Sequence, residues 1–287
     1  MFLMISGSLF LSRDIPVRKI YGKYILRIFT AYLSWSAVYA LAVYRETGAS
    51  AEIIPNIMTG HYHMWFLPMI MTMYMLVPFL KKVADSQFLT RYFLVLSFIA
   101  VFVVPQILRL VSPISEYYDE AAKKLADNFH LSIFSTHVGY FVFGYVMSRI
   151  KLSRNAERMV YVLGVLGFLG TFLYSRYSLQ NDSLYTKYPI GSGLSVLFQA
   201  TAIFVLFKEH CPANEKVRDF FRMLAKYSFG AYLAHEAVIH LLRKLGLNLL
   251  LFDTRVSVPV IASATFVVAF GISAVLNQIP VLRKYIV

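Results

Sequence analysis

Long apolar runs alternate with short charged connections along the whole chain, and this pattern predicts membrane-spanning helices. A transmembrane helix needs about twenty mainly apolar residues. Eight stretches approach that length: 25–44, 64–80, 92–110, 131–148, 159–175, 190–207, 227–242 and 256–276. The pattern therefore predicts an all-α, polytopic transmembrane helix bundle with eight full spans.

A ninth apolar segment, residues 1–12, opens the chain but is shorter. At a rise of about 1.5 Å per residue it covers roughly 18 Å, which is less than a bilayer core of about 30 Å. We interpret it as the end of a helix whose beginning is absent. We expect this segment to be weakly held in the bundle.

Composition supports a membrane protein and excludes an ordinary soluble domain. Hydrophobic residues make up 58% of the chain and charged residues 15%, whereas about a quarter of the residues of globular proteins are charged. No linker is long enough to separate domains, so residues 1–287 are predicted to form a single membrane domain.

The charges between the spans predict an orientation. Nineteen of the 28 Lys and Arg residues lie in alternate connections, at 13–27, 81–91, 149–158, 208–226 and 283–284. Six acidic residues accompany them, so this side holds the whole net charge of +13. The positive-inside rule places that side, including the C-terminus, in the cytoplasm. It also explains the excess of basic residues without a nucleic-acid partner.

Several classes of site are absent from the sequence. Cys211 is the only cysteine, which excludes an internal disulfide and a cysteine metal cluster. There is no glycine-rich phosphate loop, nucleophile elbow or zinc-protease motif. His61 and His63 supply two metal ligands at most and no third is marked, so no metal site is predicted.

The polar residues inside the spans are the candidates for function, because ionisable groups in a membrane are costly. His61 and His63 crowd one outer entrance beside Trp65, where an aromatic belt is the simpler alternative. His235 lies seven residues after Ser228, so both share one helix face. That face is either part of a substrate site or a polar clamp between helices. Beside it, Glu236 and His240, four residues apart, can pair along another face.

Four motifs, in order, resemble the acyltransferase 3 family: FLMISGSLF, HMWFLPMIMTMYMLVPFLKK, GYFVFGYVMSR and YSFGAYLAHE. The resemblance covers nearly the whole chain. It implies about ten helices with both ends cytoplasmic, in the cell membrane. It also implies transfer of an acyl group, with acetyl as the favoured case, from acyl-CoA to a hydroxyl of an extracytoplasmic glycan, as in polysaccharide O-acetylation. No bound cofactor is implied.

The resemblance also assigns roles to residues of this chain. The histidine of its second motif is His63, the implied catalytic base, with Trp65 as a stacking surface for a sugar. His61, His235 and Ser228 are the further candidates for substrate binding. Lys23 and Arg27 are the implied contacts to the phosphates of acyl-CoA, although Tyr24 stands where the family often has the first of two arginines.

One departure from the family lies at the front of the chain. The family's first helix carries a basic residue and a histidine that is its favoured base, and this chain starts after that helix. A late translational start or a truncated gene would each explain this. Two alternative functions therefore stay open: a truncated, non-catalytic relative, and a transporter of a small molecule or glycan. No pair of interrupted helices suggests the inverted repeat that many transporters have.

The charge asymmetry predicts which loops face the cytoplasm. Cysteines introduced at Ser86 and Ser153 should resist an impermeant thiol reagent in intact cells, whereas a cysteine at Ser183 should react. The measurement is labelling of single-cysteine variants before and after permeabilisation. Labelling in the opposite pattern would reverse the topology.

Overall fold

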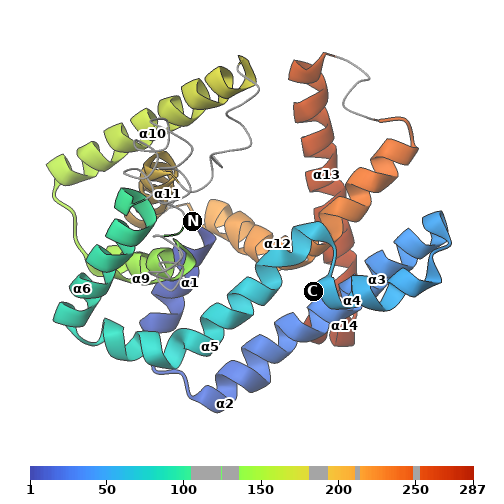
Figure 1. The fold of residues 1–287 in the computed structure, drawn as a ribbon, viewed down its shortest axis with the longest axis horizontal. Coiled ribbons are helices and arrows are strands. Elements are labelled where there is room, and N and C mark those ends of the chain that lie inside the picture. The colour runs from blue at the N-terminus through green and yellow to red at the C-terminus, as the bar shows by residue number, and fades with distance from the viewer. Residues whose placement is uncertain (105–123, 125–135, 181–192, 211–213, 248–252) are drawn as a thin grey trace. The chain divides into compact units, whose positions relative to one another are not determined.

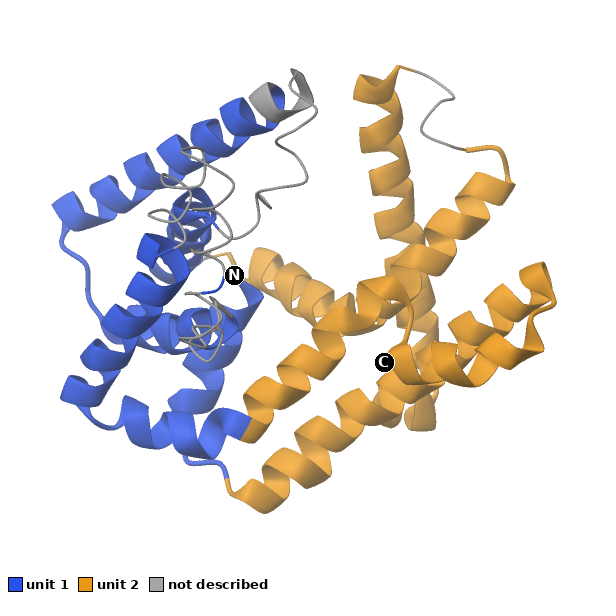
Figure 2. Ribbon diagram, in the orientation of Figure 1, with its two compact units in different colours: residues 1–15, 76–211 blue, residues 16–75, 212–287 orange. Residues whose placement is uncertain are grey.

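Regular structure in the described part of the chain is entirely helical (Figure 1). The structure is a computed structural model, and it describes all residues except 105–123, 125–135, 181–192, 211–213 and 248–252. The predicted all-α class is therefore confirmed. Packing divides the chain into two compact units (Figure 2), Met1–Ile15 with Leu76–Cys211, and Pro16–Met75 with Pro212–Val287.

Unit 1 is built from pairs of packed helices. Helix α1 packs against α9, α6 packs against α9, and α10 packs against α11. Its elements are the end of α5 (Phe66–Ala84), α1 (Phe2–Leu11), α6 (Gln87–Phe98), the π-helical η4 (Ile99–Val103), α9 (Thr136–Arg149), α10 (Arg154–Gln180) and α11 (Leu194–Glu209).

Two glycines let α1 and α9 approach each other backbone to backbone. A Cβ atom added to Gly144 would lie 2.2 Å from the Met4 main chain, and one added to Gly7 would lie 1.8 Å from the Phe141 carbonyl oxygen. Met4 and Leu11 are completely buried. The expectation that residues 1–12 are weakly held is therefore wrong. Glycines in place of larger residues at the crossing let the two helices pack in close contact.

Unit 2 is organised around α3 and α12. Helix α12 packs along α13, while α3 packs against α4 and against α14. Its elements are α2 (Val17–Lys19), the π-helical η1 (Ile20–Ile25), α3 (Leu26–Thr47), η2 (Ser50–Glu52), α4 (Ile53–Thr59), η3 (Tyr62–Trp65), the first part of α5, α12 (Glu215–Lys244), α13 (Thr254–Leu276) and α14 (Pro280–Tyr285).

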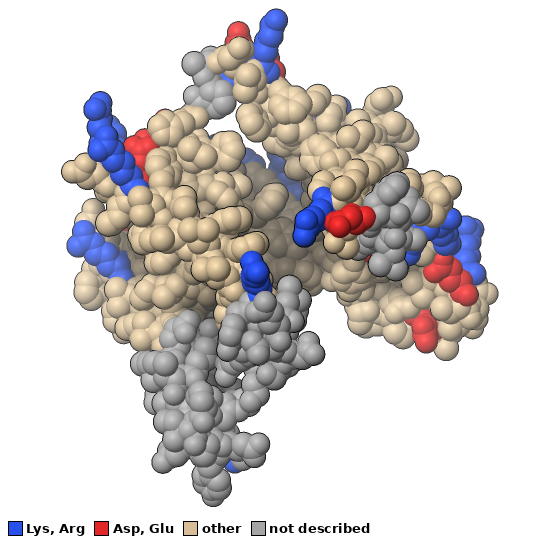
Figure 3. Space-filling view, turned by 90° about the horizontal axis from the view of Figure 1, so that it is seen from above, with Lys and Arg blue, Asp and Glu red and all other residues tan. Residues whose placement is uncertain are grey.

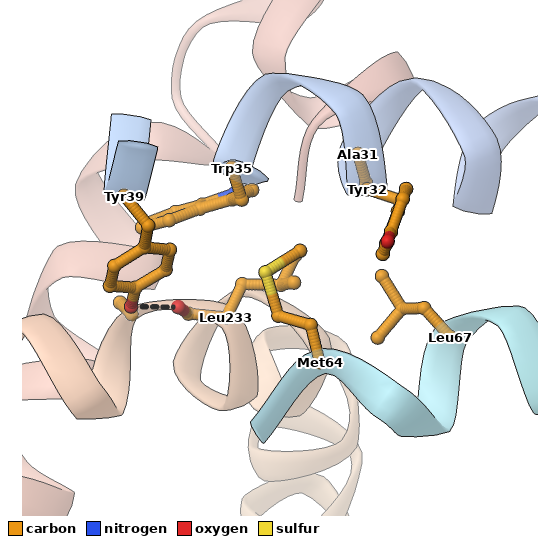
Figure 4. Close-up of a cluster of buried hydrophobic side chains, with 8 residues drawn as sticks. Ala31, Tyr32, Trp35, Tyr39, Met64, Leu67 and Leu233 are labelled. Carbon is orange, nitrogen blue, oxygen red and sulfur yellow. Dashed lines mark hydrogen bonds between the residues drawn. The ribbon is translucent and has the colours of Figure 1, made fainter. Parts of the chain in front are cut away.

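One hydrophobic cluster joins these elements in the core of unit 2 (Figure 4). Tyr32 and Trp35 come from one face of α3, Met64 from η3, and Leu67 from the first turn of α5. Leu233 of α12 completes the contact, and its carbonyl oxygen accepts a hydrogen bond drawn in the figure. The cluster fixes η3, which carries His63 and Trp65, between α3 and α12.

Polar side chains of α3 also hold the last residues of the chain. Thr30 donates to the Tyr285 carbonyl oxygen at 2.7 Å, and the Trp35 indole nitrogen donates to the Ile286 carbonyl oxygen at 3.3 Å. The last carbonyls of a helix have no partner within the helix. These side chains therefore satisfy the end of α14 and anchor it on α3.

Within the described residues, four helical segments are long and apolar enough to cross a membrane: Val17–Thr47, Ser50–Ala84, Arg154–Arg176 and Thr254–Leu276. Apart from Gly193, each of the eight predicted spans falls on helix wherever its residues are described, but 105–110, 131–135 and 190–192 lie outside that part. Eight full spans thus stay a prediction. On the face drawn in Figure 3, uncharged residues cover most of the described surface.

The close crossing of α1 and α9 predicts a large effect of one methyl group. Gly144→Ala should destabilise the protein by about 1–3 kcal/mol or more, because the added carbon meets main chain that cannot rotate away. The measurement is thermal unfolding in detergent micelles. Gly170→Ala on α10 is the control, since nothing lies within 4 Å of its Cβ position. Equal melting temperatures for the two variants would contradict the close approach.

Candidate active site

The site begins where α4 is forced to end. Gly60 has φ +71°, in the left-handed region that favours glycine, and a Cβ there would lie 2.8 Å from the Tyr32 ring. The Tyr32 hydroxyl donates to the Met58 carbonyl oxygen at 2.9 Å, which satisfies one of the last carbonyls of α4. The chain therefore leaves the helix at Gly60 and starts a new direction at His61.

The helix break brings His61 and His63 together. Residues two apart in a continuous α-helix point to nearly opposite sides. Here His61 is extended and η3 begins after it, so the two Nδ1 atoms lie 2.9 Å apart. His63 is only 7% exposed. This hydrogen bond between two buried or half-buried imidazoles is the central feature of the site.

Tyr39 of α3 forms one wall of the site. Its ring stacks on His61, with centroids 4.7 Å apart, and meets His63 edge-on at 5.2 Å. Its hydroxyl donates to the Leu233 carbonyl oxygen at 2.7 Å and accepts from the Ala237 amide at 3.2 Å. A regular helix joins these two groups directly. The phenol therefore contacts both groups at once and ties α3 to α12.

Helix α12 supplies the opposite wall. The Tyr232 hydroxyl donates to the His63 carbonyl oxygen. The His235 ring lies 4.9 Å from the His63 ring, centroid to centroid, and its Nδ1 is 2.5 Å from the Tyr232 carbonyl oxygen. A carbonyl only accepts, so Nδ1 of His235 carries a proton and Nε2 holds the lone pair when the ring is neutral.

A carboxylate reaches the rim of the site through a tyrosine. The Tyr62 hydroxyl donates to Glu236 Oε2 at 2.8 Å, and the Tyr62 ring lies 4.7 Å from that of His61. The suggested pairing of Glu236 with His240 is not what the structure has, because His240 Nε2 is 2.8 Å from Glu46 Oε1 instead. Glu236 therefore belongs to the site, and His240 does not.

The imidazole pair has a definite proton arrangement when both rings are neutral. Each ring then carries one N–H, and the short contact between the Nδ1 atoms needs one donor and one acceptor. The donor ring keeps a bare Nε2, which can accept a proton, while the acceptor ring keeps an Nε2–H. The pair therefore always presents one base and one hydrogen-bond donor. Nε2 of His63 is buried and has no hydrogen-bond partner among the described residues.

The other predicted residues lie outside this cluster. Trp65 is 62% exposed, and its ring meets the neighbouring Phe66 edge-on. Ser228 donates to the Ala225 carbonyl oxygen within α12, about 10 Å along the axis from His235. Lys23 is exposed with its Nζ near the Tyr24 ring, and Arg27 donates to the Val287 carbonyl oxygen at 2.6 Å.

The structure adds three tyrosines that the sequence did not mark: Tyr39, Tyr62 and Tyr232. The chain has twenty tyrosines, so residue type alone does not distinguish these three. A signal existed only for Tyr62, which lies between the two histidines. Within the described ranges, no group of three His, Cys, Asp or Glu residues could hold a metal ion.

Comparison with known families agrees with the sequence motifs. Residues 1–277 match the acyltransferase domain family, acyltransferase 3. The chain belongs to this family. The predicted resemblance is confirmed, and with four apolar helices of spanning length the protein is a multi-pass membrane acyltransferase. No curated protein and no solved structure matches the chain.

The two kinds of contact that Tyr39 makes, through its ring and its hydroxyl, predict a graded response to substitution. Tyr39→Phe keeps the ring on His61 and loses only the hydroxyl, so we expect a loss of about 1 kcal/mol in unfolding free energy. Tyr39→Ala removes the ring as well and should cost about 3–5 kcal/mol.

Thermal unfolding in detergent measures both effects. Tyr44→Phe is the matched control, because this tyrosine lies on the same helix and its side chain is exposed. A stability loss from Tyr39→Phe as large as that from Tyr39→Ala would show that the hydroxyl, not the ring, supports the site.

Proposed function

We propose that this acyltransferase moves an acyl group, most simply acetyl, from acyl-CoA to a hydroxyl of an extracytoplasmic glycan or similar acceptor. The observation that carries the proposal is the His61–His63 pair, with its 2.9 Å contact between Nδ1 atoms inside a ring of tyrosines. A hydroxyl is a weak nucleophile and needs a base that is neutral near pH 7, which is the usual task of histidine.

In the proposed reaction, Nε2 of His63 takes the proton of the acceptor hydroxyl. The hydroxyl oxygen forms a bond to the thioester carbonyl carbon, and the carbon–sulfur bond then breaks. The departing CoA thiolate receives the proton from the imidazolium, so the products are an ester and free CoA. For His63 to accept a proton at Nε2, its Nδ1 must carry a hydrogen and donate a hydrogen bond to Nδ1 of His61. His61 thus sets the tautomer of the base.

The walls of the site support the same assignment. Tyr39 and Tyr232 hold the rings and main chain of the pair, which leaves the imidazoles few alternative orientations. His235, with a bare Nε2 when neutral, offers a second acceptor for a proton or a substrate hydroxyl. Preorganised groups of this kind contribute to catalysis because they need not reorganise when charge develops.

The substrates are proposed to meet this site from two sides. Lys23 and Arg27 would contact the CoA phosphates, and Arg27 lies about 18 Å along α3 from Tyr39. The acyl donor must extend over that length to reach the histidines. The exposed indole of Trp65 offers a stacking surface for a sugar ring, with Ser228 a further contact along α12.

The base assignment predicts a large loss of rate. A general base typically contributes about a hundred- to ten-thousand-fold to the rate. His63→Ala should therefore lower acyl transfer by clearly more than tenfold. Trp65→Ala should raise the KM for the acceptor and leave kcat largely unchanged, because it acts in binding. The measurement is transfer of labelled acetyl groups from acetyl-CoA to oligosaccharides in proteoliposomes, normalised to folded protein.

A second histidine on α12 serves as the matched control. His240 binds Glu46 and lies outside the cluster, so His240→Ala should keep near wild-type turnover. His235→Ala distinguishes two roles for His235. If the residue clamps the helices together, its loss should mainly lower the melting temperature, whereas if it acts in the site, its loss should mainly lower the rate of acyl transfer. Turnover of His63→Ala within twofold of wild type would contradict the proposed role.

A further inference from the structure

Helix α12 begins with a segment that lies outside the packed core of unit 2. No residue from 215 to 226 is buried, and the first buried residue of α12 is Gly230. The hydrogen bond from Ser273 of α13 to the Tyr227 carbonyl oxygen, at 2.8 Å, is made just beyond this segment. At a rise of about 1.5 Å per residue, residues 215–226 extend over roughly 18 Å.

This segment starts as a capped helix. The Asn214 side chain accepts a hydrogen bond from the Lys216 amide at 2.9 Å, which satisfies one of the free amides of the first turn. Glu215 stands in that turn, where a negative charge is favourable. Local sequence therefore supports the helix from its first residue, without help from the core.

Apolar and basic side chains lie on different faces of the segment. Successive residues of a helix are about 100° apart, so Val217, Phe220 and Leu224 share one face. Arg222 and Lys226, four residues apart, share the nearly opposite face. Val217 is 39% exposed and Phe220 is 53% exposed. The segment is thus an amphipathic helix with an exposed apolar face.

Two environments do not suit such a segment. Six of the residues from 215 to 226 are charged, which is too costly for the hydrocarbon core of a bilayer. Open water is unfavourable for a face that carries Phe220 and its apolar neighbours. The interface of a membrane accommodates both faces, because apolar side chains reach the acyl chains while Lys and Arg meet the headgroups.

The charge of the segment favours anionic headgroups. Four basic residues stand against two acidic ones, so its formal net charge is +2. Arg222 Nη1 lies 2.7 Å from Asp219 Oδ1, but both side chains are exposed and such surface pairs are weak. A guanidinium also has further N–H donors that a phosphate oxygen can accept. Basic residues on an amphipathic helix are typical of binding to anionic lipids.

We propose that residues 215–226 bind the surface of a bilayer that contains anionic phospholipids. The face of Val217, Phe220 and Leu224 enters the acyl-chain boundary, while Arg222 and Lys226 bind phosphate groups. This surface is separate from the histidine pair and takes no part in the proposed reaction. Anionic lipid thereby holds the part of α12 that the core does not.

The test is fluorescence quenching on the full chain in vesicles of dioleoyl phosphatidylcholine, with and without phosphatidylglycerol. Cys211 is first replaced by serine, and a bimane dye is then attached through Val217→Cys on the apolar face or Asp219→Cys on the polar face. Lipid brominated on its acyl chains should quench the dye at position 217 about threefold more than the dye at 219. Equal quenching at the two positions would overturn the proposal.

The charge requirement is tested with the dye at position 217. Phosphatidylglycerol should increase its quenching by brominated lipid about twofold, and Arg222→Glu should remove most of that increase. Arg243→Glu makes the same charge change at an exposed position in the last turn of α12 and should leave the increase intact. Equal effects of the two reversals, each variant shown to be folded by its melting temperature, would contradict headgroup binding by the basic face.

Iodide, a quencher that stays in water, tests for other surroundings of the apolar face. If iodide reaches the dye at position 217 fully in both kinds of vesicle, the face lies in water. If neither iodide nor brominated lipid reaches the dye, protein covers the face. Either result would overturn the proposal. The measurements need no acyl transfer, so a failure here is distinguishable from a failure of the turnover assay.

Discussion

In a membrane, every main-chain polar group must find a partner within the protein, and this constraint governs the fold. Helices satisfy the constraint along their length but not at their ends. In unit 2, α3 supplies the missing partners. Its Tyr32 binds a carbonyl at the end of α4, and its Thr30 and Trp35 bind carbonyls at the end of α14. Further along α3, Tyr39 contacts a carbonyl and an amide within α12 and so holds the two helices together.

The candidate active site is a consequence of these contacts. Gly60 can leave the helical path because Tyr32 satisfies a carbonyl at the end of α4 and because no Cβ fills the space of its ring. Only that break allows His61 and His63 to turn toward each other. Tyr39 and Tyr232 then hold the pair against α12. The histidine pair, whose tautomer matters for the proposed reaction, is thus held by tyrosines that also hydrogen-bond to main-chain groups.

Unit 1 packs its helices in a different way. At the crossing of α1 and α9, Gly7 and Gly144 replace side-chain packing by direct contact between main chains. Beside them, the change from α6 to η4 and the small Gly139 border a cavity whose described lining is mostly apolar.

The sequence by itself determined the helical class, because apolar runs about twenty residues long have few other solutions in a membrane. It also determined the family, and it marked His61, His63 and His235 as unusual, since histidine is costly among apolar residues. Only the tertiary structure decided that these three lie together, that Glu236 joins them through Tyr62, and that His240 pairs with Glu46. Such choices depend on which helix faces which. Local periodicity gives the face of one helix, whereas its partner is set by packing between residues far apart in the chain, such as Tyr39 and Leu233.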